Sequence, residues 1–168
     1  MKLSLTYLTL LLVMLADNAR ATTVVAPTFD QLVDEAEVIF QGRVTAVRSQ
    51  WTGEGAQRVI VTFITFSVED SLKGNPGQSY TIRMIGGTVD GETIEIADAP
   101  KFAVGNRDVL FVEHNGSQFI PLVGITHGRF HVKRDQVGRE SVTTNEGKIL
   151  TDLPQFKAAI REKIQRAR

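Results

Sequence analysis

Apolar residues first recur at helical spacing in the segment TFDQLVDEAE. Its apolar side chains are Phe29, Leu32, Val33 and Ala36. Thr28 precedes this pattern and Gln31 follows Thr28 by three residues, which is the spacing of a capping box. We therefore expect a helix of roughly two turns from Phe29 to about Glu35.

From residue 38 onward, apolar and polar residues alternate, which is typical of a strand with one buried face. One face carries Val38, Phe40, Val44 and Ala46, and the other carries Gln41, Arg43 and Thr45. The longer segment RVIVTFITFSVED begins with consecutive apolar residues, so we expect its first half to be covered on both faces. In QSYTIRMIGG, we expect Tyr80, Ile82 and Met84 to face inward.

Turn residues divide the next part of the chain. Gly86-Gly87 predicts a bulge or sharp bend, and the glycine-rich segment after it predicts an exposed excursion with a short strand at Thr93 to Ile96. Asn115-Gly116 is a strong hairpin signal, with a strand expected on either side. The segment THGRFHVKRD predicts a strand with Phe130 and Val132 inward, followed by a polar loop.

The chain ends in a second helical pattern, for which Asp152 is the expected cap. The apolar stripe of this helix is Leu153, Phe156, Ile160 and Ile164. Together, the patterns predict a mainly β protein: a five- or six-stranded, OB-like antiparallel barrel with a short N-terminal helix and a C-terminal helix over 152–166. We expect residues 22–168 to form this single domain.

The N-terminus predicts a secretory signal peptide. Lys2 precedes an apolar run, and Ala19 and Ala21 are the small residues that a signal peptidase requires. A membrane anchor is the alternative, but the run is shorter than the ~20 residues that span a bilayer. We expect removal of residues 1–21, a mature chain that begins at Thr22 without a stable membrane span, and export to the periplasm or the extracellular medium.

Charge and cysteine content limit the classes of function. Lys and Arg number 19 and Asp and Glu number 19, so the net charge is zero. This balance gives no electrostatic reason to expect nucleic acid or an anionic membrane as a partner. The chain has no cysteine, so the core of this exported domain must be held by burial alone.

The order of the segments EAEVIFQGRV, SLKG and FAVGNRDVLFVE resembles the netrin-like module of the tissue inhibitors of metalloproteinases and of complement C-terminal domains. The similar parts are Ala36 to Val47, Val59 to Gly74 and Val104 to Glu113. Those modules are five-stranded OB barrels flanked by helices, so the resemblance implies the same fold here, in a cysteine-free, exported version.

The resemblance also implies a partner, a zinc metalloprotease. In those inhibitors the free N-terminal amine and first carbonyl chelate the protease's catalytic zinc, a position that falls on Thr22, followed by Thr23. An α-amine titrates near neutral pH, so its unprotonated form can occupy the open coordination position of a zinc ion. The inhibitors anchor this segment with disulfides, which this chain lacks, so a frayed terminus without inhibitory role is the alternative.

His127 and His131 are four residues apart, a spacing that on a helix brings two imidazoles to one metal ion. The surrounding residues indicate a strand, where four residues span about 13 Å and the two rings cannot share one zinc. We therefore expect no intrinsic metal site. We expect His127, Arg129, His131 and Lys133 to form a solvated basic face; a ligand-binding face is the alternative.

Trp51, with Arg48 nearby, falls in the segment SQWTGEGAQR, which we expect to be a loop between the first two long strands. In OB barrels this loop flanks the binding face. An exposed Trp51 there can stack on a sugar or a peptide side chain. A Trp51 that folds back over the end of the barrel is the alternative.

The sequence contains no cysteine nucleophile, no Gly-x-Ser-x-Gly elbow and no His-Glu-x-x-His pair. We therefore expect a non-enzymatic protein-binding domain without a cofactor, in its sharpest form a metalloprotease inhibitor or regulator that acts through its mature N-terminus. The alternative is a carbohydrate- or small-ligand-binding OB module of the cell envelope that uses Trp51 and the face from His127 to Lys133. An enzyme without a local motif is a third hypothesis.

Overall fold

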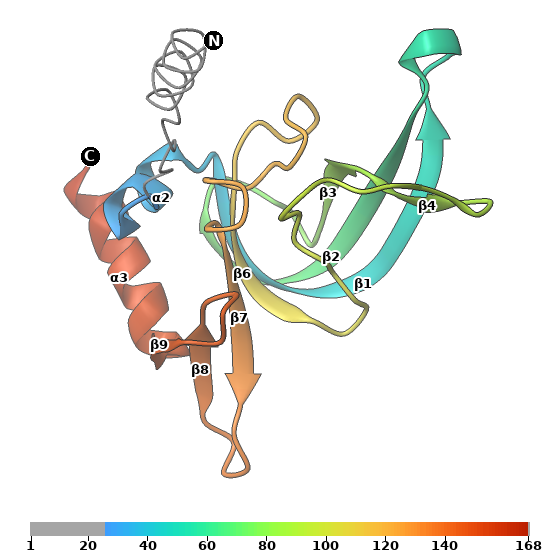
Figure 1. The fold of residues 1–168 in the computed structure, drawn as a ribbon. Helices are drawn as coiled ribbons and strands as arrows, with labels where there is room; N and C mark the ends of the chain where they lie inside the picture. Colours follow the sequence, from blue (N-terminus) through green and yellow to red (C-terminus); the bar gives the residue numbers. More distant parts are fainter. Residues whose placement is uncertain (1–25, 168) are drawn as a thin grey trace, which may run out of the picture.

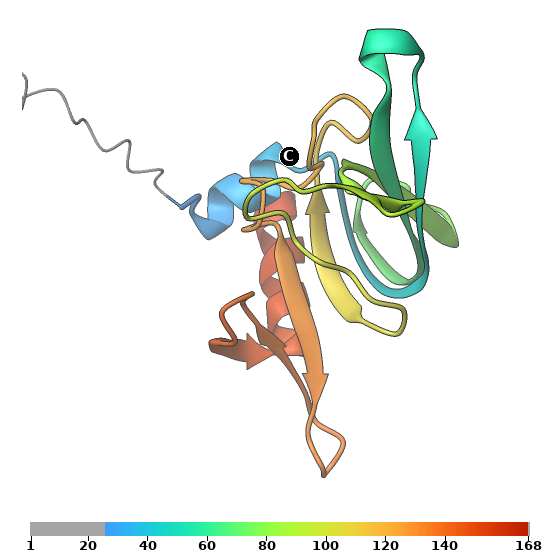
Figure 2. The same ribbon diagram turned by 45° about the vertical axis from the view of Figure 1, so that its right-hand side comes forward.

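The computed structural model describes residues 26–167 as a mainly β fold with two helices (Figures 1 and 2). The predictions for residues 1–21, Thr22 and Thr23 lie outside the described residues. The main sheet is antiparallel, with seven strands in the order β3-β2-β1-β6-β7-β8-β9, and β4 and β5 form a separate hairpin. The strands are β1 (Val38–Thr52), β2 (Val59–Lys73), β3 (Ser79–Ile85), β4 (Gly87–Val89), β5 (Glu92–Ile94), β6 (Arg107–Val112), β7 (Arg129–Arg134), β8 (Glu140–Thr143) and β9 (Ile149–Asp152).

Both predicted helices are confirmed. α2 (Phe29–Glu35) begins at a capping box, in which the side chains of Thr28 and Gln31 each accept a hydrogen bond from the other residue's backbone N–H. α3 (Leu153–Arg166) begins after Asp152, whose carboxylate caps its N-terminus. Neither helix within residues 26–167 is long and apolar enough to cross a membrane.

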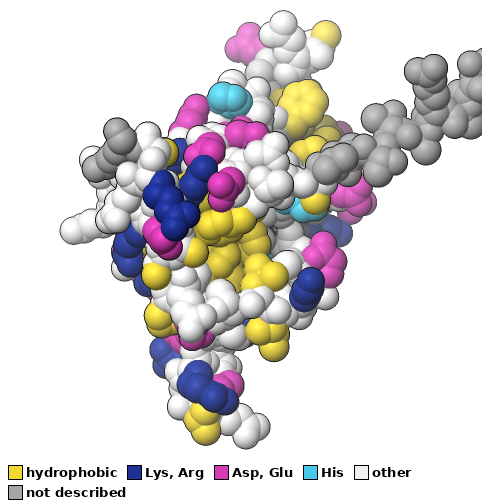
Figure 3. All heavy atoms as spheres, turned by 90° about the vertical axis from the view of Figure 1, so that its left-hand side faces the viewer, with side chains coloured by type: hydrophobic (Ala, Val, Ile, Leu, Met, Phe, Trp, Pro, Cys, Tyr) yellow, Lys and Arg dark blue, Asp and Glu magenta, His cyan; other side chains and the backbone are white. Residues whose placement is uncertain are grey.

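Two hydrophobic cores lie on opposite faces of the main sheet. The first is packed between the sheet and the helices and consists of Leu32, Val33, Ala36, Ile39, Val109, Phe111, Val123, Phe130, Val132, Val142, Leu153, Phe156 and Ile160. The second lies within the curve of β1 and β2 and consists of Phe40, Val44, Ile64, Phe66, Ile82, Met84, Leu110, Val112, Ile120 and Leu122. On the face of the molecule that carries α2 and α3, hydrophobic side chains gather in a central hollow (Figure 3).

The central strand β1 is buried on both faces in its first half, which corrects the prediction of a single buried face. Ile39 belongs to the first core and Phe40 to the second. Gln41, predicted to face solvent, is buried because α3 covers it, and its side-chain oxygen accepts a hydrogen bond from Nζ of Lys157 at 3.0 Å. The predicted two-sided burial at the start of β2 is confirmed by Ile60 and Val61.

β1 and β2 form one long hairpin that curves around the second core (Figure 1). Three register shifts between these strands act as bulges, which bend a strand and increase its twist. Gly42 lies at one of them, where an added Cβ atom would come within 2.9 Å of the Phe40 ring and of the Ser67 carbonyl oxygen. The absence of a side chain at Gly42 therefore allows the bend.

The sheet does not close into a barrel, because its edge strands β3 and β9 do not pair with each other. The predicted mainly β fold is confirmed, but the predicted barrel is not. Beyond Asn115-Gly116, turns and one isolated bridge between Val112 and Leu122 replace the predicted second hairpin strand. Conversely, β8 and β9 lie in the segment predicted to be a polar loop, because pairing with β7 organises residues that carry no strong strand pattern.

Candidate functional site

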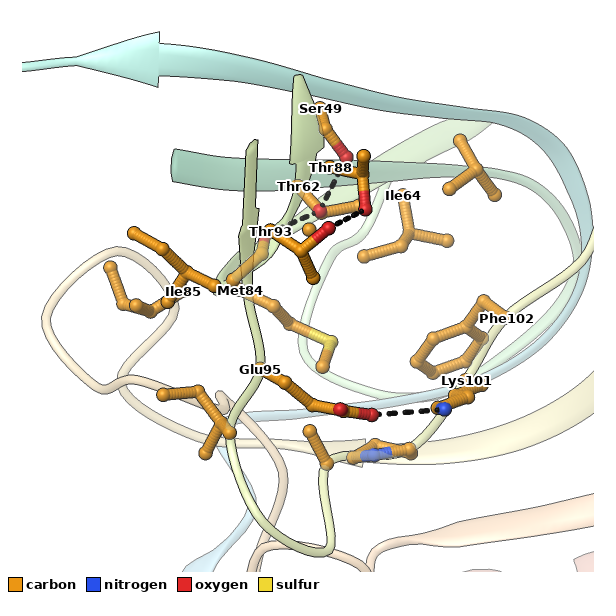
Figure 4. Close-up of a pocket in the computed structure, with 17 residues that line it drawn as sticks. Ser49, Thr62, Ile64, Met84, Ile85, Thr88, Thr93, Glu95, Lys101 and Phe102 are labelled. Atoms are coloured by element: carbon orange, nitrogen blue, oxygen red, sulfur yellow. Dashed lines mark hydrogen bonds and ion pairs between the residues drawn. The ribbon is translucent and has the colours of Figure 1, made fainter. Parts of the chain in front are cut away.

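A hollow of about 340 Å³ lies between the curved sheet of β1, β2 and β3, the β4–β5 hairpin and residues 95–102 (Figure 4). We call it the hairpin pocket. The register of β1 with β2 places Val47 opposite Ile64 and Ser49 opposite Thr62. Because directly opposed residues of an antiparallel pair share a face, all four side chains line the same pocket.

The interior of the hairpin pocket is apolar. Ile64 and Met84 belong to the second core and are almost completely buried, and the pocket exposes part of this core between the hairpin and the sheet. Phe102 forms part of the wall, and its ring packs edge-to-face on Phe66 with 5.7 Å between ring centroids. An apolar group that enters the pocket therefore exchanges water for aliphatic and aromatic contacts.

Hydroxyl groups gather at the hairpin side of the pocket (Figure 4). Thr62 donates its hydroxyl proton to the Gly86 carbonyl oxygen at 2.6 Å, and Ser49 Oγ lies 2.8 Å from Thr62 Oγ1. Since Thr62 has a single proton to donate, Ser49 must be the donor to Thr62. Both hydroxyl oxygens then retain acceptor capacity for a group that donates a hydrogen bond. On the hairpin itself, Thr88 and Thr93 share a hydrogen bond of 2.8 Å.

The predicted bend at Gly86-Gly87 is confirmed and shapes this cluster. Both glycines have positive φ, 103° and 128° respectively, as the chain turns from β3 into β4. A Cβ atom on Gly87 would overlap the hydroxyls of Thr62 and Ser49. Glycine is therefore required both for the turn and for the approach of the hairpin to the hydroxyl cluster.

The mouth of the hairpin pocket carries one ion pair, with 3.1 Å between Lys101 Nζ and Glu95 Oε1. Both side chains are largely exposed, so this pair adds little to stability. Glu95 and Lys101 are the two charged residues among the described residues that line the pocket. The interior therefore offers no fixed charge to a bound molecule.

A buried polar cluster supports the wall of the hairpin pocket from behind. Asp108 is 0% exposed and Arg129 is 3% exposed, and Arg129 Nη2 donates to Asp108 Oδ2 at 3.0 Å. Arg129 also donates to the backbone oxygen of Lys101 at 2.8 Å and lies 3.9 Å from the centroid of the Phe102 ring. Arg129 thereby fixes the segment that forms the pocket wall.

The predicted solvated basic face on β7 is wrong at two positions. Arg129 is buried, and His131 donates through Nδ1 to Asp108 Oδ1 at 2.7 Å. The cause is the β6–β7 register, which places His131 opposite Asp108. Lys133 is exposed, as predicted. His127 does not join His131: it lines a different hollow, next to Pro27.

Trp51 lies in β1, which corrects the prediction of a loop at this position, and Arg48 lies in the same strand. Trp51 is paired with Ile60, and the Arg58 guanidinium lies 4.1 Å from the centroid of a Trp51 ring. The alternation of β1 places Trp51 on the face of Ser49 and Arg48 on the opposite face. The structure therefore does not bring Arg48, Trp51, His127 and His131 into one site.

Sequence reasoning missed the residues that shape this site, namely Ser49, Thr62, Thr88, Thr93, Phe102 and Asp108. The strand register that joins Ser49 to Thr62 cannot be read from either strand alone. Asp108 does have a local signal, because it is a carboxylate within the apolar strand segment RDVLFV. Within residues 26–167, no group of three or more His, Cys, Asp and Glu side chains is arranged to hold a metal ion.

Comparison with known proteins gives no family assignment for this chain. No family model matches it, and no curated protein matches it.

Proposed function

We propose that this chain is a binding module whose hairpin pocket takes a small, mainly apolar ligand that carries a hydroxyl or another hydrogen-bond donor. The observation that carries the proposal is the apolar interior formed by Ile64, Met84 and Phe102, with the Ser49–Thr62 hydroxyls on one side. Ligand sites in proteins have this composition, with a few polar groups that orient the ligand, and volumes of roughly 300 to 1,000 Å³.

Binding accounts for the hydroxyl cluster better than catalysis does. A serine or threonine nucleophile needs an adjacent general base. Ser49 and Thr62 instead bond to each other and to the Gly86 carbonyl oxygen, and the described lining residues include no histidine. These contacts support a site that holds a ligand without transforming it.

A small apolar ligand also suits the pocket better than a carbohydrate. A sugar ring presents hydroxyls around its edge and commonly stacks its apolar face on an exposed aromatic ring. The interior of the pocket offers mainly aliphatic side chains, Arg129 already covers one face of the Phe102 ring, and Arg58 already covers one face of Trp51. The small-ligand form of the hypothesis is therefore the one that we propose.

Saturation-transfer NMR on the chain from Thr22 tests the proposal, with hexanol and methyl glucoside as probes. We expect transfer to hexanol and none to methyl glucoside. A Val47→Phe variant fills the pocket and should abolish the transfer. The matched control is Gln50→Phe, which adds the same ring on the opposite, exposed face of β1. Equal transfer in both variants would refute binding in the hairpin pocket.

We also propose that β1, β2, β3 and β6 form an incomplete OB-like barrel, as the netrin-like resemblance implies. Two contacts support this: the Ile85 backbone N–H donates to the Phe119 carbonyl oxygen at 2.8 Å, and Val112 bridges Leu122. The segment after β6 thus reaches across to β3, on the side where a barrel would close.

Metalloprotease inhibition through Thr22 follows from that resemblance and is a separate hypothesis. It is tested by titrating the chain from Thr22, and an N-acetylated copy, against zinc metalloproteases. Inhibition that acetylation abolishes would support chelation by the free amine. Equal inhibition by both copies, or none by either, would count against it.

A further inference from the structure

Another hollow, of about 350 Å³, lies on the surface beside residues 96–97 and next to the loop that follows β6. Two strongly exposed apolar side chains flank it: Phe119 is 68% exposed and Ile125 is 54% exposed. Ile96, Ile120 and Leu122 line it between them. We call this area the Phe119–Ile125 surface.

The loop that carries Phe119 is fixed to the sheet. The Phe119 carbonyl oxygen accepts from the Ile85 backbone N–H at 2.8 Å. The side chain of Asn115 accepts from the Arg83 backbone N–H at 3.0 Å and donates to the Thr81 carbonyl oxygen at 2.9 Å. The backbone that carries the Phe119 ring is therefore held in place by hydrogen bonds while the ring itself is exposed.

The backbone at Ile125 is held in a costly conformation. Its φ is 67°, in the left-handed region that β-branched residues rarely adopt. Because the Ile125 side chain is exposed, its burial contributes little free energy to offset this backbone strain. Backbone strain that is not offset by packing is concentrated at functional sites.

The charge at this surface is negative. Glu113 lines the hollow, and no Lys or Arg is present among the described lining residues. Glu113 forms no ion pair with another residue in the described range 26–167. An apolar hollow with an unpaired carboxylate in its lining complements an apolar group beside a cation.

We propose that the Phe119–Ile125 surface binds a segment of a partner protein in which an apolar side chain is flanked by Lys or Arg. The apolar side chain enters the hollow beside Phe119 and Ile125, and the cation lies against Glu113. This surface shares Ile96 with the hairpin pocket, but Glu113, Phe119 and Ile125 do not line that pocket, so either proposal can fail without the other.

Backbone amide NMR of the chain from Thr22 tests this inference with three acetylated, amidated peptides: Gly-Lys-Leu-Phe-Lys-Gly, its Glu-for-Lys counterpart, and its Ser-Ser counterpart without the apolar pair. We expect the first peptide to shift the amides around Phe119 and Ile125 in a saturable way, and the other two to leave them unchanged. Glu113→Gln should weaken the binding about two- to fivefold, as for a partly solvated ion pair.

Phe119→Ser should abolish the shifts. The ring is exposed, so we expect the variant to keep its fold and its unfolding midpoint. The matched control is Val137→Ser, which removes an equally exposed apolar side chain from the β7–β8 turn and should leave binding unchanged. Binding of the acidic peptide, shifts that Phe119→Ser does not remove, or no shift with any peptide would each overturn the proposal. So would concentration-dependent shifts of the same amides without peptide, because a second copy would then cover the surface.

Discussion

Asp108 is a fully buried carboxylate that accepts hydrogen bonds from two side chains. Arg129 contacts one of its oxygens and His131 the other. We predict that Asp108→Asn lowers the free energy of unfolding by about 3 to 5 kcal/mol, because it leaves the buried Arg129 charge without its counter-ion. Urea denaturation measures this change.

The reference for this prediction is the double variant Asp108→Asn, Arg129→Met. It removes the uncompensated charge, so it should recover part of the loss, with a coupling energy above about 0.5 kcal/mol. If the losses of stability in Asp108→Asn and in Arg129→Met add up to the loss in the double variant, Asp108 and Arg129 are not energetically coupled, contrary to what their hydrogen bond indicates.

At Ile125 we predict a substitution that raises the free energy of unfolding. Asparagine tolerates the left-handed backbone region better than a β-branched residue does. Ile125→Asn should therefore raise the free energy of unfolding by about 1 kcal/mol. Ile125→Val keeps the β-branch and should leave it unchanged. A loss of stability in Ile125→Asn would show that the Ile125 side chain contributes packing that outweighs its backbone strain.

At the scale of elements, Arg107 joins β6 to β2 and β8. Its guanidinium pairs with Glu69 at 2.6 Å and with Glu140 at 2.5 Å. The hydrogen bonds from Arg107 hold the pKa of Glu69 and that of Glu140 below the ordinary value of 4.5, and the bond to Glu69 is the main cause that raises the pKa of Arg107.

These shifts predict how stability depends on pH. A carboxylate with a lowered pKa in the folded state stabilises the fold above its unfolded pKa, and this stabilisation is lost as the pH falls through the folded pKa. The free energy of unfolding should therefore decrease below about pH 4.5. Arg107→Met should reduce this decrease, because both carboxyl groups then titrate closer to their ordinary pKa.

Urea denaturation at neutral and acidic pH measures the effect. Arg43→Met is the control, since Arg43 is half exposed and lies 3.6 Å from Glu69. It should change the pH dependence less than Arg107→Met does. An unchanged pH dependence in Arg107→Met would contradict the assignment.

Local patterns predicted the elements well where each has one buried face and a clear boundary. The Thr28 capping box and the Asp152 cap defined both helices, and Tyr80, Ile82 and Met84 belong to or pack against the second core as expected. The failures arose where burial depends on another element. Gln41 is covered by α3, and Arg129 is buried because β6 presents Asp108. Such contacts depend on strand order and register, which local patterns do not encode.

At the scale of the whole molecule, β1 and β6 lie between two cores, and the second core opens at the hairpin pocket. The first core is covered by α2 and α3. The second is covered in part by the β4–β5 hairpin and residues 95–102, and Met84, Ile64 and Phe102 meet the pocket there. The site is thus a place where the fold leaves part of its own core accessible.

Ligand binding in the hairpin pocket should be visible in the NMR signal of the Met84 methyl group. Met84 is the one methionine of residues 26–167, so methyl-labelled methionine gives a single signal from these residues, and that signal reports on the pocket. Hexanol is titrated at concentrations that leave the backbone amide spectrum otherwise unchanged. We predict that the Met84 signal shifts and saturates, and that Val47→Phe abolishes this shift while Gln50→Phe does not. A Met84 signal that stays unmoved by hexanol in the unmodified chain would contradict the proposal that the hairpin pocket binds small apolar ligands.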